Sequence, residues 1–172
     1  MRIVALAGLP GTGKSALARA LARELGAPVF DKDEFRRELF GELPAYTPEH
    51  KDAATRASYA AAGAALRSGS ACVILDGRTY SRRTQVDELR AFARELGAEL
   101  VLVECRCAPQ LARERIERDR ALGTHPAPDR TAGLHERLSR EAEPLQGALA
   151  IDTDERSPEE LARMLASALS VE

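Results

Sequence analysis

The chain of 172 residues and 18.6 kDa, with 44% hydrophobic and 30% charged residues, is long enough for one domain with its own core. No apolar stretch approaches the roughly 18–20 residues that a membrane helix needs. A formal net charge of −2 argues against a broad nucleic-acid surface but leaves room for a small basic pocket. We therefore expect a single domain over residues 1–172 that works in the cytoplasm without a membrane contact.

Strand-like and helix-like patterns alternate along the whole chain. Apolar runs predict strands over residues 2–7, 28–31, 71–75, 99–104 and 148–151. Helical spacing predicts helices over residues 15–25 and over about 49–67, 109–121 and 132–143. It also predicts a helix that begins at residue 33 and another that ends at residue 97. A capping box at 157–160 begins a last helix. The alternation predicts a three-layer α/β fold with a parallel sheet of about five strands and helices on both faces. Ligands of such sheets bind beyond the carboxyl ends of the strands.

A glycine-rich segment follows the first strand. Residues 8–15 read Gly-Leu-Pro-Gly-Thr-Gly-Lys-Ser, which matches the phosphate-binding P-loop pattern in full. In this pattern Lys14 reaches the β- and γ-phosphates, and the hydroxyl of Ser15 holds Mg²⁺. We therefore expect a P-loop NTPase fold that binds ATP and Mg²⁺. The expected nucleotide contacts are Gly8, Pro10, Gly11, Thr12, Gly13, Lys14, Ser15 and Ala16.

Asp33 follows the second predicted strand. A carboxylate at this strand end would face the γ-phosphate across the cleft and could accept a proton from an attacking hydroxyl. Arg36 shares a helical face with Asp33 and could hold an anionic group of the substrate. The alternative is that Asp33 only caps the helix that follows, a role that is compatible with catalysis.

Asp76 ends the third predicted strand, in the run Val-Ile-Leu-Asp-Gly-Arg. An aspartate at this position resembles the Walker B residue that holds Mg²⁺ directly or through water. Arg78 follows as a candidate for contact with the acceptor. The alternative for Asp76 is an ordinary polar residue at a strand end.

Arg115 and Arg118 lie three residues apart on the predicted helix before a loop rich in Gly, Pro and Thr, so they share one helical face. Two guanidinium groups on a closing segment, over about residues 108–133, could neutralise the transferring phosphoryl group and contact the nucleotide. The alternative is a salt-bridged helix surface, because acidic residues alternate with these arginines.

Taken together, these motifs resemble the small P-loop kinases related to polynucleotide kinase, adenylylsulfate kinase, gluconate kinase and the zeta-toxin-like phosphotransferases. The resemblance spans nearly the whole chain through the P-loop, Asp-x-Asp-x-x-Arg at 31–36, Tyr-Thr-Pro-Glu at 46–49, Leu-Asp-Gly at 75–77 and Arg-x-x-Arg at 115–118. It implies Asp33 as the base or acceptor ligand and Arg115 and Arg118 as residues of a helical lid over ATP. Dimers are common in similar kinases, so a homodimer stays an open alternative.

Three hypotheses about function follow. The first is an ATP-dependent kinase with Lys14, Asp33, Arg115 and Arg118 as its catalytic residues, acting on a small-molecule hydroxyl. The second is a polynucleotide 5′-hydroxyl kinase, which the net charge disfavours. The third is a non-catalytic, regulatory nucleotide-binding module.

Overall fold

A computed structural model describes residues 1–41, 46–123 and 131–170 of the chain. Its strands are β1 (Arg2–Ala7), β2 (Val29–Asp31), β3 (Cys72–Asp76), β4 (Glu99–Arg106) and β5 (Leu149–Asp152). Its helices are α1 (Lys14–Leu25), α2 (Lys32–Phe40), α3 (Pro48–Arg67), α4 (Arg83–Glu95), α5 (Pro109–Leu122), α6 (Ala132–Glu141) and α7 (Pro158–Ser170).

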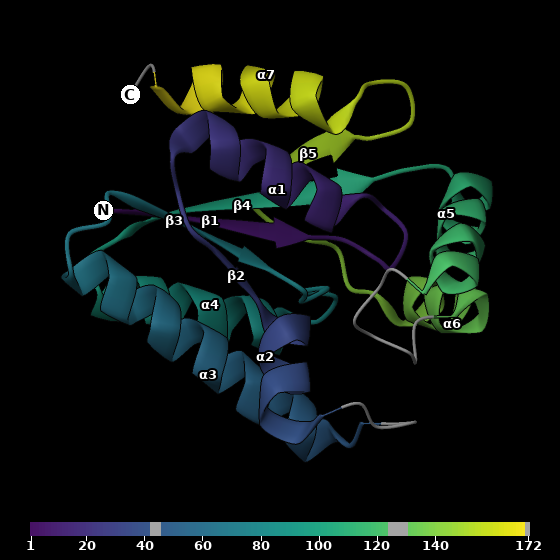
Figure 1. Ribbon diagram of the computed structural model, residues 1–172, viewed down its shortest axis with the longest axis horizontal. Helices are drawn as coiled ribbons and strands as arrows, with labels where there is room; N and C mark the ends of the chain where they lie inside the picture. Colours follow the sequence, from purple (N-terminus) through teal and green to yellow (C-terminus); the bar gives the residue numbers. More distant parts are fainter. Residues whose placement is uncertain (42–45, 124–130, 171–172) are drawn as a thin grey trace.

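The strands form one parallel sheet in the order β2-β3-β1-β4-β5, with β1 at its centre (Figure 1). Residues 3–7 of β1 are fully buried, because helices cover both faces of the sheet. Since alternate residues of a strand point to opposite faces, Val4 and Leu6 pack on one side, and Ile3 and Ala5 on the other. The predicted α/β P-loop fold with a five-stranded parallel sheet is confirmed.

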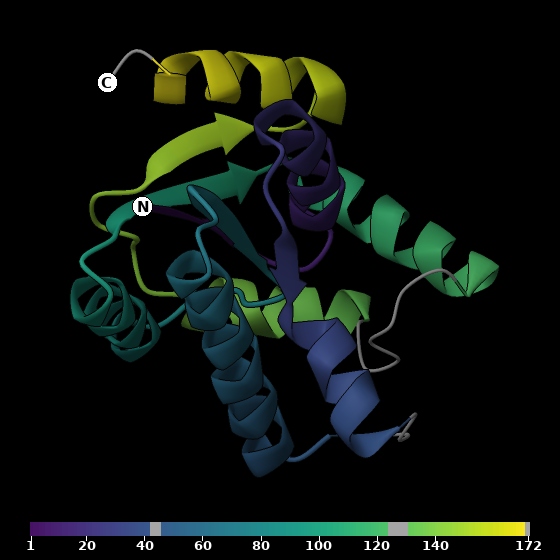
Figure 2. The ribbon, with the colours of Figure 1, turned by 60° about the vertical axis from the view of Figure 1, so that its left-hand side comes forward.

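Two helical layers enclose this sheet. Helices α1 and α7 cover one face, where Leu17 and Leu21 meet Leu161 and Leu165. Helices α3 and α4 cover the other face, as Figure 2 shows from a second direction. Helices α5 and α6 lie beyond the carboxyl ends of β1 and β4 instead (Figure 1). They therefore border the edge of the sheet where ligands of this architecture bind.

Most predicted elements agree with the structure to within two residues. The capping box at the start of α7 is present, because Ser157 Oγ accepts from the backbone N–H of Glu160 at 3.2 Å and Glu160 Oε2 accepts from the backbone N–H of Ser157 at 2.9 Å. Helix α6 ends at Glu141, two residues before the predicted end, and β4 runs to Arg106, two residues beyond it. Residues 124–130, within the predicted closing segment over about residues 108–133, lie outside the described residues, as do residues 42–45. Across the described ranges, no helix is long and apolar enough to cross a membrane.

Candidate active site

The segment between β1 and α1 is a glycine-lined loop. Gly8, Gly11 and Gly13 have φ values of 133°, 84° and 82°, in the left-handed region that favours glycine. A Cβ on Gly8 would clash with the carbonyl oxygen of Cys105, and a Cβ on Gly11 would clash with the backbone of Ala112. The loop therefore needs glycine both for its own conformation and for its close approach to β4 and α5.

The first turn of α1 can receive an anion. Gly13 is the N-cap residue, no side chain in the described ranges caps this end, and no acidic residue lies in the first turn. The backbone N–H groups and the positive end of the helix dipole are therefore available to phosphate oxygens. The Lys14 ammonium donates to the carbonyl oxygen of Leu9 at 2.8 Å, which holds its charge over the loop. Loop, helix start and lysine together form a phosphate cradle.

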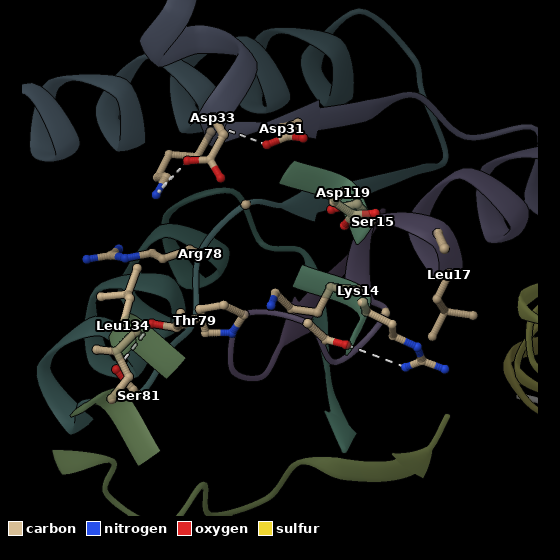
Figure 3. Close-up of a pocket in the computed structure, with 18 of the residues that line it drawn as sticks. Lys14, Ser15, Leu17, Asp31, Asp33, Arg78, Thr79, Ser81, Asp119 and Leu134 are labelled. Carbon is tan, nitrogen blue, oxygen red and sulfur yellow. Dashed lines mark hydrogen bonds and ion pairs between the residues drawn. The ribbon is translucent and has the colours of Figure 1, made fainter. Parts of the chain in front are cut away.

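Two carboxylates lie where β2 passes into α2. Asp31 caps α2, because its Oδ1 accepts a hydrogen bond from the backbone N–H of Asp33 at 2.8 Å (Figure 3). The alternative that Asp33 caps this helix is therefore wrong: α2 begins at Lys32, one residue earlier than predicted, so the capping position falls on Asp31. The Asp33 carboxylate, 14% exposed, instead forms ion pairs with Lys32 Nζ at 3.1 Å and with Arg36 at 3.3 Å.

Asp76 ends β3 as the register partner of Asp31 on β2. Asp76 is 4% exposed, and its Oδ1 has no hydrogen-bond partner in the part of the chain that the structure describes. Burial, and then the negative charges of Asp76 and Asp33, raise the pKa of Asp31 from 3.8 to about 7. These carboxylates form a buried negative site that a cation would neutralise.

The oxygen groups at this place fit Mg²⁺. Mg²⁺ prefers carboxylate and hydroxyl oxygens and is usually held by one or two protein groups, with water and substrate phosphates as its other ligands. Asp76 supplies a buried carboxylate oxygen that lacks a partner, and Ser15 lines the adjoining cavity. Among the described residues, no three or more His, Cys, Asp or Glu side chains gather into a metal site of their own. A metal shared with phosphate and water, held by Ser15 and Asp76, agrees with this donor set.

Arg36, one helical turn after Asp33, is only 2% exposed. Its guanidinium carbon lies 4.0 Å from the centroid of the Tyr46 ring, and the Tyr46 hydroxyl donates to the carbonyl oxygen of Gly41 at 2.7 Å. The arginine also lines the cavity. It therefore holds Asp33 in place and keeps a buried cation at this end of the site.

Arg78 is held by side chains from α3 and α4. It donates to Glu88 at 2.7 Å and to the Tyr59 hydroxyl at 3.3 Å, and 11% of its side chain is exposed. The Tyr59 hydroxyl lies 3.1 Å from the hydroxyl of Tyr80, whose pKa burial raises well above its usual value. The Tyr80 phenol therefore stays neutral, and the Tyr59 hydroxyl and Glu88 fix the position of the guanidinium at the cavity wall.

Arg115 joins α5 to the P-loop and to the end of β5. It donates to the hydroxyl and the carbonyl oxygen of Thr153 at 3.0 and 2.7 Å, and it lies 3.5 Å from the carbonyl oxygen of Gly11. The Thr153 hydroxyl also lies 3.1 Å from the carbonyl oxygen of Thr12, which accepts from it. Arg118 is exposed and lines the same cavity. The two arginines thus border the site differently: Arg115 is bound to its wall, and Arg118 lies at its edge.

A buried histidine connects α6 to the P-loop. His135 is 5% exposed, and its Nδ1 lies 2.7 Å from the carbonyl oxygen of Pro10. Because a carbonyl oxygen can only accept, Nδ1 must carry the hydrogen and donate it. The phosphate cradle is therefore braced from α6 as well as from α5.

One cavity of about 1120 Å³ lies at the carboxyl ends of the strands (Figure 3). Of the groups described above, it is lined by Lys14, Ser15, Asp31, Asp33, Arg36, Arg78, Arg115, Arg118 and Thr153. Lining residues from the P-loop, α1, α5, α6 and the segment after β5 include apolar side chains, among them Leu17, Leu111 and Leu134. The remaining lining residues come from the end of β2, α2, α3, the β3–α4 connection and the first turn of α4. Those of them that we call the polar end are Lys32, Asp33, Glu34, Arg36, Arg37, Lys51, Asp52, Thr55, Gly77, Arg78, Thr79, Ser81, Arg82 and Gln85.

The parallel sheet with a phosphate cradle between β1 and α1 defines the chain as a P-loop protein of the α/β class. A family model described as an AAA domain, AAA_33, matches residues 3–145, and the chain belongs to this family. No curated protein matches the chain.

Solved structures of the same fold cover nearly the whole chain. A kinase candidate from Chloroflexus aurantiacus superposes with a TM-score of 0.78 and 21% identity, over 96% of this chain and 97% of that one. The APS kinase of Mycobacterium tuberculosis, solved with AMPPNP and APS, has a TM-score of 0.72 and 21% identity, over 98% and 97%. A gluconokinase from Sinorhizobium meliloti has a TM-score of 0.64 and 22% identity, over 99% and 96%. The resemblance to the small P-loop kinases is thereby confirmed.

Three residues at the site were not singled out by the sequence analysis. Asp31 was visible as the first acid of Asp-x-Asp, but only the strand register pairs it with Asp76. Thr153 lies two residues after the fifth predicted strand, so the strand-end rule could have found it. For His135 the sequence carries no signal, because its partner Pro10 lies 125 residues away.

Proposed function

We propose that this protein is a kinase that transfers the γ-phosphoryl group of ATP to a hydroxyl group of a small molecule. The observation that carries the proposal is the position of Asp33. Its carboxylate is paired with Lys32 and Arg36, and it lines the same cavity as Lys14 and Ser15 of the phosphate cradle. A module that only binds nucleotide has no need of a carboxylate held at this place.

Each residue then has a stated task. The P-loop N–H groups and Lys14 hold the β- and γ-phosphates, while Ser15 and Asp76 hold Mg²⁺, which neutralises phosphate charge when bound. Asp33 accepts the proton of the acceptor hydroxyl as its oxygen bonds to the γ-phosphorus. The bond between that phosphorus and the bridging oxygen breaks, so that ADP and a phosphate ester are formed. Arg115 and Arg118 face the nucleotide from α5.

The acceptor is the open part of this proposal. The acceptors of the kinases of this fold differ, and the sheet and the cradle are common to all of them. A polynucleotide 5′-hydroxyl is the second candidate, and it is tested in the same experiment.

The proposal is tested by measuring ADP release with sugars, nucleosides, amino alcohols, hydroxy acids and a 5′-hydroxyl oligonucleotide as acceptors. Asp33→Asn should lower kcat by at least about 100-fold, because it removes the proton acceptor without changing the shape of the side chain. The dissociation constant for ATP should change by less than about threefold, since the ion pairs described for this carboxylate are with Lys32 and Arg36, which lie on α2 and not in the cradle. Glu38→Gln, at an exposed position of the same helix outside the cavity, is the matched control.

Lys14→Ala should remove turnover altogether. Normal ADP production by this variant would defeat the whole proposal, and full transfer by Asp33→Asn would defeat the assignment of the base.

A further inference from the structure

The polar end offers no apolar surface to a ligand. Its side chains are charged, hydroxyl or amide groups, and Gly77 contributes only backbone. The nearby aromatic rings are already occupied: Tyr46 lies under the Arg36 guanidinium, and Tyr59 stacks on Phe92 with centroids 4.7 Å apart. Nucleobases are commonly held by stacking between aromatic or apolar side chains. The described wall of this end lacks such a surface.

Positive charge predominates among the same residues. The cations are Lys32, Arg36, Arg37, Lys51, Arg78 and Arg82, and they outnumber the carboxylates of this end even when Asp31 is counted with them. Arg36 is almost fully buried and Arg78 nearly so, which makes their charges less screened by solvent than those of surface arginines. The end therefore favours an anion over a neutral or cationic group.

Arg78 is oriented before any ligand arrives. Within the described residues, its bonds to Glu88 and Tyr59 involve two of the five N–H groups of the guanidinium. Glu88 is 60% exposed, so solvent weakens its neutralising effect on the arginine. A guanidinium held in one orientation binds a carboxylate or phosphate with little further loss of side-chain entropy.

Gln85 adds an acceptor for a hydroxyl. It lines the polar end from the first turn of α4, and its Oε1 is buried without a hydrogen-bond partner among the described residues. A buried oxygen of this kind costs free energy until a donor reaches it. A hydroxyl group of a ligand is such a donor.

We infer that the acceptor of the proposed kinase is a small, hydroxyl-rich molecule that also carries an anionic group, a carboxylate or a phosphate. This inference rests on the proposed function and names its substrate class. The anionic group binds Arg78, one hydroxyl donates to Gln85, and a further hydroxyl faces Asp33. Cationic amino sugars and acceptors that bind through a nucleobase do not match this end.

The inference is tested with acceptors that differ mainly in charge. Gluconate is compared with sorbitol, glycerate with glycerol, and glycerol phosphate with both three-carbon compounds, which separates carboxylate from phosphate. Glucosamine and a 5′-hydroxyl oligonucleotide complete the set, and ADP release and product mass are measured. The anionic member of a pair should have a kcat/KM at least about tenfold higher, as expected for charge-assisted hydrogen bonds. Equal or better use of a neutral, cationic or oligonucleotide acceptor would overturn the inference while leaving the kinase proposal intact.

Variants of two neighbouring arginines sharpen the test. Arg78→Gln should raise KM about 10- to 100-fold for the anionic acceptor and by less than about threefold for its neutral counterpart. Arg83→Gln, an exposed change outside the cavity, should leave both values unchanged. An equal loss for both acceptors would mean that Arg78 only supports the fold, and it would contradict the inference.

If no acceptor is phosphorylated, measurements of anion binding still distinguish the kinase proposal from the inferred anion site. That result would defeat the proposed function, while calorimetry with the anionic compounds would still decide the inference. Binding of an anion to the wild-type protein that is weakened in Arg78→Gln, with no binding of the neutral counterpart, supports an anion site. Absence of anion binding overturns it.

Discussion

Asp31 and Asp76 are register partners at the carboxyl ends of the neighbouring parallel strands β2 and β3. Asp31 also caps α2 through the backbone N–H of Asp33. One carboxylate therefore connects the proposed metal ligand to the helix that carries the proposed base. A change at Asp31 should affect both the stability of the fold and the chemistry of the site.

The pH dependence of stability tests this relationship. Burial and the charges of Asp76 and Asp33 raise the pKa of Asp31 to about 7, so the folded chain binds this proton more tightly than the unfolded chain. The resulting stabilisation is fully present below the unfolded value of 3.8 and is lost as the pH rises through 7. In the absence of Mg²⁺ and nucleotide, we compare the Tm of Asp31→Asn with that of the wild type. The difference should shift by about 3–6 °C in favour of the variant when the pH is raised from 5 to 8.

The control for this measurement is Asp87→Asn, which removes a carboxylate that is 58% exposed on α4. Its Tm difference from the wild type should be the same at both pH values. A pH-independent difference for Asp31→Asn as well would show that Asp31 is ionised in the folded state.

Gly77→Ala tests how tightly the strand ends are packed. Gly77 has a φ of 81°, and an added Cβ would clash with Asp31 Oδ1 and lie 3.0 Å from the backbone nitrogens of Lys32 and Asp33. The substitution should lower the free energy of unfolding by about 2–4 kcal/mol and reduce kcat, because the turn that carries Asp33 must move. Urea unfolding and ADP release measure the two effects.

Gly69→Ala is the matched control, since Gly69 has a φ of 105° but an added Cβ would have nothing within 4 Å. It should cost only the backbone strain, about 1–2 kcal/mol, with normal kcat. Equal effects of the two substitutions would argue against a close packing requirement at Gly77.

Asp76→Asn tests the metal site without relying on turnover. The buried Oδ1 of Asp76 lacks a partner in the described ranges, and the amide removes the charge that would attract Mg²⁺. The affinity for ADP measured calorimetrically in the presence of Mg²⁺ should fall at least about tenfold, while the affinity in EDTA should stay nearly constant. A similar loss in both buffers would remove Asp76 from the metal site.

His135 should matter for nucleotide binding through the backbone of the P-loop. His135→Phe keeps a ring of similar size but leaves the buried Pro10 carbonyl oxygen without its donor. The dissociation constant for ATP should rise about 5- to 50-fold. His135→Asn, whose amide can replace Nδ1 as the donor, should recover most of the affinity. Identical binding by both variants and the wild type would show that this hydrogen bond does not position the cradle.

Local patterns predicted much of the architecture. The P-loop, the capping box at Ser157 and the alternation of strands and helices depend on residues a few positions apart, so their geometry can be read from spacing. The same holds for Arg115 and Arg118, which share a helical face and both line the cavity.

Local sequence patterns could not predict the contacts between segments that are far apart in the chain. Arg115 binds Thr153, 38 residues away, and His135 binds Pro10, 125 residues away. Asp33 was weighed as the cap in place of Asp31. A helix capped by Asp33 would begin at residue 34, whereas α2 begins two residues earlier, at Lys32.

By itself, then, the sequence determined that this chain has a phosphate cradle at the end of a buried strand and acidic residues at two further strand ends. Tertiary structure decided which carboxylate caps, which one is paired with cations and which one keeps an oxygen without a hydrogen-bond partner in the described structure. The physical reason is that a cradle is built from the conformation of consecutive residues, whereas the ionisation and partners of a carboxylate depend on burial and on charges brought together by the sheet. The polar end of the cavity likewise depends on tertiary structure, since three separate segments of the chain contribute its charged residues.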